Sequence, residues 1–268
     1  PVITGIETMA QGGFEDSTFL LPKLSFDQSK VPGGTISSAN PNAGKVYTQE
    51  AGVLHVDAAT NQYSQYDEGE REIAYIVVHT AENGSERPAV KIAKYMATSG
   101  KKASVHYHTD ALGNLVSQVP EKDRAWHAAN RQVDEHSIGF EQCGRARYDS
   151  HPDQLYDNSA RLIAELCLKY NIAPSHVIPD PYSNPNDVDN ASGLHRADDH
   201  SPWRKISKTQ PLPSEKIKAE NTILGHNQVS PFDAGHWDPG AGYDFEILMA
   251  KVRHYIKVGG LNRTGYYG

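Results

Sequence analysis

The residues best suited to catalysis lie in the stretch GHNQVSPFDAGHWDP, at positions 225–239. It brings His226, His236 and Asp238 close together among glycine and proline, and far upstream the apolar run IAYIVV ends on His79. Imidazole and carboxylate are the groups that bind zinc when no thiolate is supplied, and a catalytic site keeps one position open for water. The pattern therefore predicts a hydrolytic zinc site, although a chain with 13 histidines also brings some of them together by chance.

Two further groups of residues could contribute to such a site. Glu141 lies in the run SIGFEQC beside apolar residues, where an inward carboxylate costs free energy unless it is paired or used. Near zinc it could act as a general base, whereas on an edge strand it would only face solvent. The segment DRAWHAAN combines groups that suit a glycan or peptide ligand: Arg124, Trp126, His127 and Asn130. A buried tryptophan beside a hydrogen-bonded histidine is the more frequent explanation of such a segment.

Composition and charge limit the classes of protein to which the chain can belong. Its 268 residues are enough for one large domain or two small ones. A net charge of -7 argues against nucleic-acid binding, which needs a basic surface stripe. No apolar run approaches the roughly 20 residues of a membrane-spanning helix. Two cysteines, Cys143 and Cys167, are too few for a disulfide scaffold; free buried thiols are expected, with a single bridge as the alternative.

Hydrophobic periodicity and turn residues predict a mixed α/β pattern. Strands are expected at 73–78, 104–110, 115–120, 137–143 and 222–225, and amphipathic helices at 84–100, 157–172 and 243–260. ALGN between the second and third strands indicates a hairpin. Ser85 is the expected cap of the first helix, and Gly100 and Gly259 are the expected ends of the first and last helices.

The chain divides unevenly into three parts. Residues 1–70 lack sustained periodicity and are rich in turn residues, so an extended arm or small subdomain packed on the main body is expected. Residues 71–260 form the main domain, with a polar insertion at about 174–221. Loops of this length within a domain are usually functional or disordered. Residues 261–268 form a C-terminal tail.

Five segments of the chain, taken in order, resemble type 2 N-acetylmuramoyl-L-alanine amidases, a superfamily that includes peptidoglycan recognition proteins and phage amidase endolysins. The segments are VVHTAENGS, SVHYHTDALGN, DRAWHAAN, SIGFEQCG and ILGHNQVSP…HWDPGAGYDF, and they cover roughly residues 73–258. The resemblance implies an α/β fold with a mixed central β-sheet flanked by helices. It also implies hydrolysis of the amide that joins the lactyl group of N-acetylmuramic acid to L-alanine of the stem peptide.

The resemblance also implies roles for individual residues. His79, His226 and Asp238 match the three zinc ligands of the family, and Glu141 matches the general base of its bacterial branch. Many members carry a lysine two residues before the aspartate ligand, where this chain has His236. That histidine would donate to the tetrahedral oxyanion. Its ordinary pKa of about 6.5 would make activity more sensitive to pH than a lysine would.

Substrate and location follow from the same resemblance. The substrate groove is expected to include His127, with Trp126 and Asn130 beside it. Some relatives have a catalytic tyrosine where this chain has Val105, so Glu141 is left as the main candidate for the base. The partner would be peptidoglycan or a muropeptide, met outside the cell or at the cell wall by a secreted amidase or a phage-encoded lysin. The main alternative is a non-catalytic muropeptide-binding module, although such proteins generally lack part of the metal-binding set. A zinc hydrolase with a non-wall substrate has no positive support.

Overall fold

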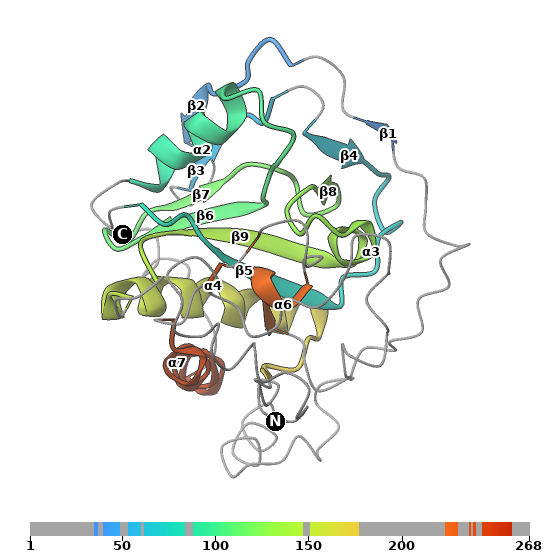
Figure 1. Ribbon diagram of the computed structural model, residues 1–268. Helices are drawn as coiled ribbons and strands as arrows, with labels where there is room; N and C mark the ends of the chain where they lie inside the picture. The colour runs from blue at the N-terminus through green and yellow to red at the C-terminus, as the bar shows by residue number, and fades with distance from the viewer. Residues whose placement is uncertain are drawn as a thin grey trace, which may run out of the picture.

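The computed structural model describes residues 35–36, 40–48, 53–59, 62–83, 88–146, 151–176, 223–229, 236, 238–239 and 243–258 (Figure 1). Its strands are β1 (Thr35–Ile36), β2 (Val46–Thr48), β3 (Leu54–Val56), β4 (Tyr63–Gln65), β5 (Tyr75–Thr80), β6 (Tyr107–Asp110), β7 (Leu115–Ser117), β8 (Arg124–Ala125), β9 (Ser137–Cys143) and β10 (Ile223–Gly225). Its helices are α2 (Ala89–Thr98), α3 (Arg131–Glu135), α4 (Asp153–Tyr170), α6 (His226–Val229) and α7 (Phe245–Lys257).

The centre of the fold is a mixed sheet with the strand order β10-β5-β9-β6-β7-β3-β2. Strands β10, β5, β9 and β6 are parallel to one another, whereas β6 and β7 form the antiparallel hairpin predicted from ALGN. A smaller sheet has the order β1-β4-β8. Helices pack against both faces of the central sheet (Figure 1). The predicted α/β fold, with a mixed central sheet flanked by helices, is therefore confirmed.

Strand residues alternate between the two faces of the central sheet. In β5, Ile76 and Val78 join the main core, to which α4 and α7 contribute, while Val77 packs on the opposite face with residues of α3 and α6. Helix α2 also covers this second face, and Figure 1 shows it across the sheet from α4 and α7. Because side chains alternate with a period of two along a strand, His79 joins Val77 on the face between α2 and α6.

Helix α2 is the first helix predicted from the sequence. The expected cap, Ser85, lies outside the described residues, and Pro88 occupies the N-cap position. The buried side chains of the helix are the small residues Ala89, Ala93 and Ala97. Ile92 is only partly buried and lines a cleft beside the sheet. The alanines let the helix approach the sheet closely, and its larger apolar residues form a wall of the cleft.

The two long helices have clear start and stop signals. Helix α4 begins at Asp153, four residues before the predicted start, and ends at Asn171, whose φ of 54° is the left-handed conformation that commonly terminates helices. Helix α7 begins at Phe245, and its N-cap is Asp244, whose carboxylate accepts hydrogen bonds from the backbone N–H groups of Glu246 and Ile247. The predicted stop at Gly259 lies outside the described residues.

Part of the region predicted as an arm is paired with the central sheet. β2 pairs with β3 in antiparallel fashion, and β3 lies parallel to β7, where Nδ1 of His55 and Oγ of Ser117 are 2.8 Å apart. Residues 1–34, most of the insertion and the tail at 261–268 lie outside the described part of the chain. Cys143 and Cys167 are free and buried, which confirms that prediction. No helix among the described residues is long and apolar enough to cross a membrane.

Ala129, in the turn between β8 and α3, has a positive φ of 52°. This conformation costs an L-residue other than glycine roughly 1–2 kcal/mol, and the greater freedom of glycine in the unfolded chain offsets about 0.4–1 kcal/mol of that. We expect Ala129→Gly to raise the free energy of unfolding by about 0.5–1 kcal/mol, or Tm by about 2 °C. Thermal denaturation checks this, with the buried neighbour Ala128→Gly as a control that should lower Tm. A lower Tm for Ala129→Gly would contradict the expectation.

Candidate metal centre

Polar side chains from neighbouring strands form one row across the central sheet. The parallel register pairs His79 of β5 with Glu141 of β9, and Glu141 in turn with His108 of β6. On the other side of β5, the register of β10 brings His226, the residue that follows this strand, to the level of His79. Side chains of paired residues on adjacent strands are neighbours on one face of the sheet. Residues far apart in the sequence are therefore brought together by strand register alone.

Asp238 adds a carboxylate to this row. Its Oδ1 lies 3.0 Å from Nδ1 of His226, and its Oδ2 lies 3.3 Å from Nδ1 of His79. One donor atom from each of the three residues lies within 4.8 Å of the others. The donors of a tetrahedral zinc ion, with bonds of about 2.0–2.1 Å, are roughly 3.3 Å apart. The three side chains thus form a group that could hold a metal ion.

The charges around the row also favour a cation. Burial raises the pKa of Glu141 well above its usual value, and the negative charges of Asp238 and Glu82 raise it further. Burial also raises the pKa of Asp238, but the charges and hydrogen bonds of His226 and His79 outweigh this effect and hold the pKa well below the usual range. Burial lowers the pKa of His226 against the opposing charge of Asp238. The ionised carboxylate of Asp238 therefore provides negative charge that a dication would neutralise, and a dication would also favour the ionised form of Glu141.

A cleft of about 850 Å³ opens over this row of side chains. His236 lines it, with its ring centroid 4.2 Å from that of His226, so the structure brings this predicted residue to the site. On the opposite wall, helix α2 contributes Tyr95, and Lys101 lies 5.5 Å from the centre of the Tyr95 ring. The cleft therefore combines a polar floor with an aromatic and cationic wall.

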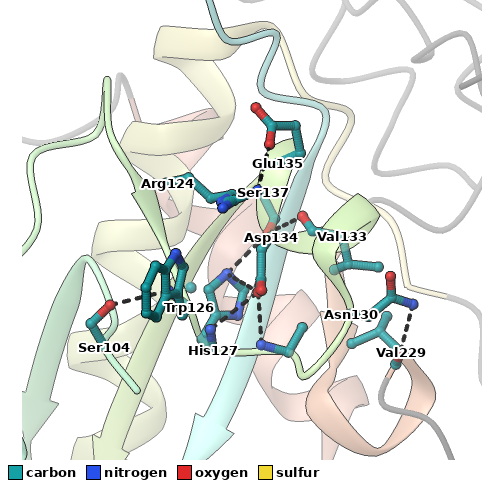
Figure 2. Close-up of polar contacts among 12 residues, drawn as sticks. Ser104, Arg124, Trp126, His127, Asn130, Val133, Asp134, Glu135, Ser137 and Val229 are labelled. Atoms are coloured by element: carbon teal, nitrogen blue, oxygen red, sulfur yellow. Dashed lines mark hydrogen bonds and ion pairs between the residues drawn. The ribbon is translucent and has the colours of Figure 1, made fainter. Parts of the chain in front are cut away.

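The structure separates the three predicted substrate-binding residues of DRAWHAAN (Figure 2). Trp126 lines the cleft, and its Nε1 donates to Oγ of Ser64 at 3.1 Å. Asn130 is instead the N-cap of α3: its side chain accepts from the backbone N–H of Gln132 and donates to the carbonyl of Val229. Asn130 is not among the residues that line the cleft.

His127 lies at the wall of the cleft, but its ring nitrogens are directed into the protein. Nδ1 of His127 lies 3.1 Å from Nε2 of His79. Nε2 of His127 lies 3.1 Å from Oγ of Ser137, and both residues are drawn in Figure 2. Burial and the neighbouring His79 lower the pKa of His127 well below its usual value. Sequence reasoning did not identify Ser137, because a serine at the first position of a strand carries no chemical pattern of its own.

The buried carboxyl of Asp134 should make the free energy of unfolding depend on pH. Burial raises the pKa of its carboxyl to about 7, although the backbone N–H groups of His127 and Ala128 oppose the shift. An unfolded aspartate has a pKa of about 3.9. At pH values between about 3.9 and about 7, the folded state therefore retains this proton and the unfolded state does not. The resulting stabilisation is complete below about pH 4 and is lost as pH rises through about 7. Asp134→Asn keeps an oxygen acceptor but cannot titrate. It should therefore reduce the pH-dependent part of the free energy of unfolding by roughly 2–4 kcal/mol.

Urea denaturation of the wild-type chain and of Asp134→Asn, at intervals from pH 5 to pH 8.5, measures this difference. We expect the free energies of unfolding of the two proteins to converge as pH rises. Parallel pH profiles would show that the buried carboxyl does not titrate in this range.

A buried pair of imidazoles with two carboxylates at the floor of a cleft could hold a metal ion, as hydrolytic metal centres do. Sequence comparison gives the class of protein. The family model for N-acetylmuramoyl-L-alanine amidase, Amidase_2, matches residues 69–241. The match covers more than half of the chain and every predicted site residue. The chain therefore belongs to the N-acetylmuramoyl-L-alanine amidase family. No curated protein matches it significantly.

Several solved structures are similar to this chain at low sequence identity. The structure of PlyL is 24% identical over 39% of this chain and 65% of that chain, with a TM-score of 0.35, so the match spans slightly less than two thirds of PlyL. A selenomethionine derivative of AmpD is 19% identical over 74% of this chain and 93% of that chain, with a TM-score of 0.44. The endolysin LysCS from Clostridium intestinale URNW is 14% identical over 74% of this chain and 94% of that chain, with a TM-score of 0.42.

Proposed function

We propose that the protein is a zinc-dependent amidase that hydrolyses the bond between the lactyl group of N-acetylmuramic acid and L-alanine of the stem peptide. The convergence of His79, His226 and Asp238 beside the buried Glu141 is the observation that carries this proposal. Family membership supplies the reaction class. In this proposal residues 71–260 are the catalytic domain, and the protein acts outside the cell or at the cell wall.

His79, His226 and Asp238 would hold the zinc ion through two imidazole nitrogens and one carboxylate oxygen. When bound there, zinc polarises the scissile carbonyl and lowers the pKa of water. Glu141 accepts the proton of the attacking water on its carboxylate and later transfers it to the leaving nitrogen of alanine. A cation held by the three ligands would favour the ionised form of this carboxyl, which is the form that can accept a proton.

The cleft is large enough for a muropeptide. Its volume of about 850 Å³ lies within the range of roughly 300–1,000 Å³ that is typical of ligand sites. Trp126 and Tyr95 offer apolar faces to a sugar or peptide, and Lys91 and Lys101 offer cations to peptide carboxylates. The substrate would thus lie between α2 and the row of side chains, with its amide above Glu141.

His236 is proposed as the donor to the oxyanion that forms during attack. Its ring lies beside that of His226 at the edge of the metal-binding set, where it can face the substrate carbonyl. We expect His236→Ala to lower kcat by roughly 10²–10³-fold, the usual cost of losing one oxyanion donor. Zinc content should stay at the wild-type level in elemental analysis. Loss of zinc from this variant would instead make His236 a ligand and exclude the assignment of Asp238.

The test of the proposed function is digestion of a soluble muropeptide by the purified protein. The expected product is a stem peptide with a free alanine amino terminus, detected by mass spectrometry and amine labelling, and formed only by zinc-loaded protein. The matched control is His79→Gln, which removes one ligand of the set. Tight binding of the muropeptide without release of the peptide would identify a recognition module instead.

A further inference from the structure

The ring of His79 has a second contact that the proposed reaction leaves unexplained. Its Nδ1 faces Asp238 at 3.3 Å and is therefore the nitrogen directed at the metal-binding set. Its Nε2 lies on the other side of the ring, 3.1 Å from Nδ1 of His127. Two imidazole nitrogens at this distance share a single proton, so one ring must donate and the other must accept.

The contacts of Ser137 determine the direction of these hydrogen bonds. Oγ of Ser137 lies 2.6 Å from the carbonyl oxygen of Val133, and a carbonyl can only accept. The serine hydroxyl proton is therefore directed at Val133, and Oγ must accept from its other neighbour, Nε2 of His127, at 3.1 Å. With its proton on Nε2, a neutral His127 has a bare Nδ1, which accepts the Nε2–H of His79.

We propose that His127 is a positioning residue that holds the ring of His79 through this relay and thereby leaves Nδ1 of His79 free for the metal. This inference rests on the proposed function only in taking His79 as a ligand. The direction of the relay is Nε2–H of His79 to His127, Nε2–H of His127 to Ser137, and O–H of Ser137 to the carbonyl of Val133. A partner on the second nitrogen of a ligating histidine fixes both its tautomer and its orientation.

The residues around His127 leave space for its ring and fix the backbone that carries it. Gly139 of β9 lies directly beneath it, and a Cβ at that position would be 2.5 Å from Cγ of His127. The carboxylate of Asp134 accepts the backbone N–H groups of His127 and Ala128 at 3.1 Å and 2.8 Å, which fixes the segment that carries the ring. The same carboxylate is 3.6 Å from Nε2 of His127, too far for a hydrogen bond, so Ser137 remains the acceptor.

Zinc affinity, measured by competition with a chromophoric chelator, tests the relay. His127→Leu removes the acceptor and should weaken zinc binding by about 10–100-fold, the usual effect of losing a partner of a metal ligand. His127→Asn restores an oxygen at the place of Nδ1 and should return the affinity to within about threefold of wild type. A merely structural role would not be rescued by asparagine. Wild-type affinity in His127→Leu would overturn the inference.

A matched control separates zinc affinity from loss of fold stability. His151 is buried, with both ring nitrogens within 3.1 Å of oxygen acceptors, and it does not line the cleft. His151→Leu should lower Tm and leave zinc affinity unchanged. If it weakened zinc binding as much as His127→Leu, the loss would reflect general destabilisation, and the relay would be rejected.

The tautomer of His127 gives a readout that requires neither zinc nor activity. Imidazole nitrogen chemical shifts, measured by NMR on protein with isotope-labelled histidines, should show a neutral His127 with its proton on Nε2, with and without zinc. The signal is assigned by its absence from His127→Asn. A proton on Nδ1 would overturn the inference even if the amidase reaction were established. Conversely, a protein that binds no zinc would refute the proposed function and leave this measurement valid.

Discussion

Removal of zinc is expected to lower the rate of muropeptide hydrolysis by at least about 10³-fold, because a metal ion supplies several kcal/mol of transition-state stabilisation. The proposed site for the ion is the place where the two buried imidazoles of His79 and His226 face one carboxylate, that of Asp238. Dialysis against a strong chelator, followed by a rate measurement and elemental analysis, checks the prediction. Addition of one equivalent of zinc should restore the rate.

The same treatment should reveal the contribution of the ion to folding. Binding to the native state alone raises apparent stability by mass action, so Tm should fall on chelation and recover with zinc. In His226→Gln, which lacks one ligand, chelation should change Tm much less. Full activity after exhaustive chelation would mean that the row of side chains is not a metal centre.

Replacement of Glu141 by glutamine is expected to lower kcat by about 10²–10⁴-fold, the range associated with loss of a general base. The change keeps the size and polarity of the side chain but removes its ability to accept a proton. The zinc ligands are untouched, so zinc content should remain at the wild-type level. Single-turnover hydrolysis and elemental analysis of Glu141→Gln and the wild-type protein measure both quantities.

Glu121 offers a control for the loss of a partly buried carboxylate. It contacts Tyr107, Tyr170 and Lys169 in a different part of the fold and does not line the cleft. Glu121→Gln should lower stability and leave kcat close to that of the wild type. A Glu141→Gln enzyme with wild-type kcat would exclude Glu141 as the base and direct attention to other cleft residues.

The fold class could be predicted from the sequence because the signals of the central sheet are local. The run IAYIVV is fully buried in β5 where the structure describes it as strand, and SIGFEQC is β9 from its first residue to its last. Helix starts were less accurate: α4 begins before the predicted residue because Pro152 provides an N-terminus that apolar periodicity does not show. Pairing of β2 and β3 with the sheet depends on contacts distant in sequence, which periodicity cannot reveal.

The candidate site was predicted to different degrees for different residues. His79, His226 and Asp238 could be selected because they lie at strand ends and in a nearby loop and because they match the ligand positions of the family that the chain resembles. Their convergence depends on strand register, which only the structure supplies. The environment of His127 could not be predicted, because it depends on the serine that opens β9 and on the space above Gly139.

Anomalous diffraction from a crystal of the zinc-loaded protein tests the central claim most directly. We predict one strong zinc peak per chain, at about 2.0–2.2 Å from Nδ1 of His79, Nδ1 of His226 and one carboxylate oxygen of Asp238. A peak at another place, or coordination by His236 with Asp238 turned away, would contradict the account.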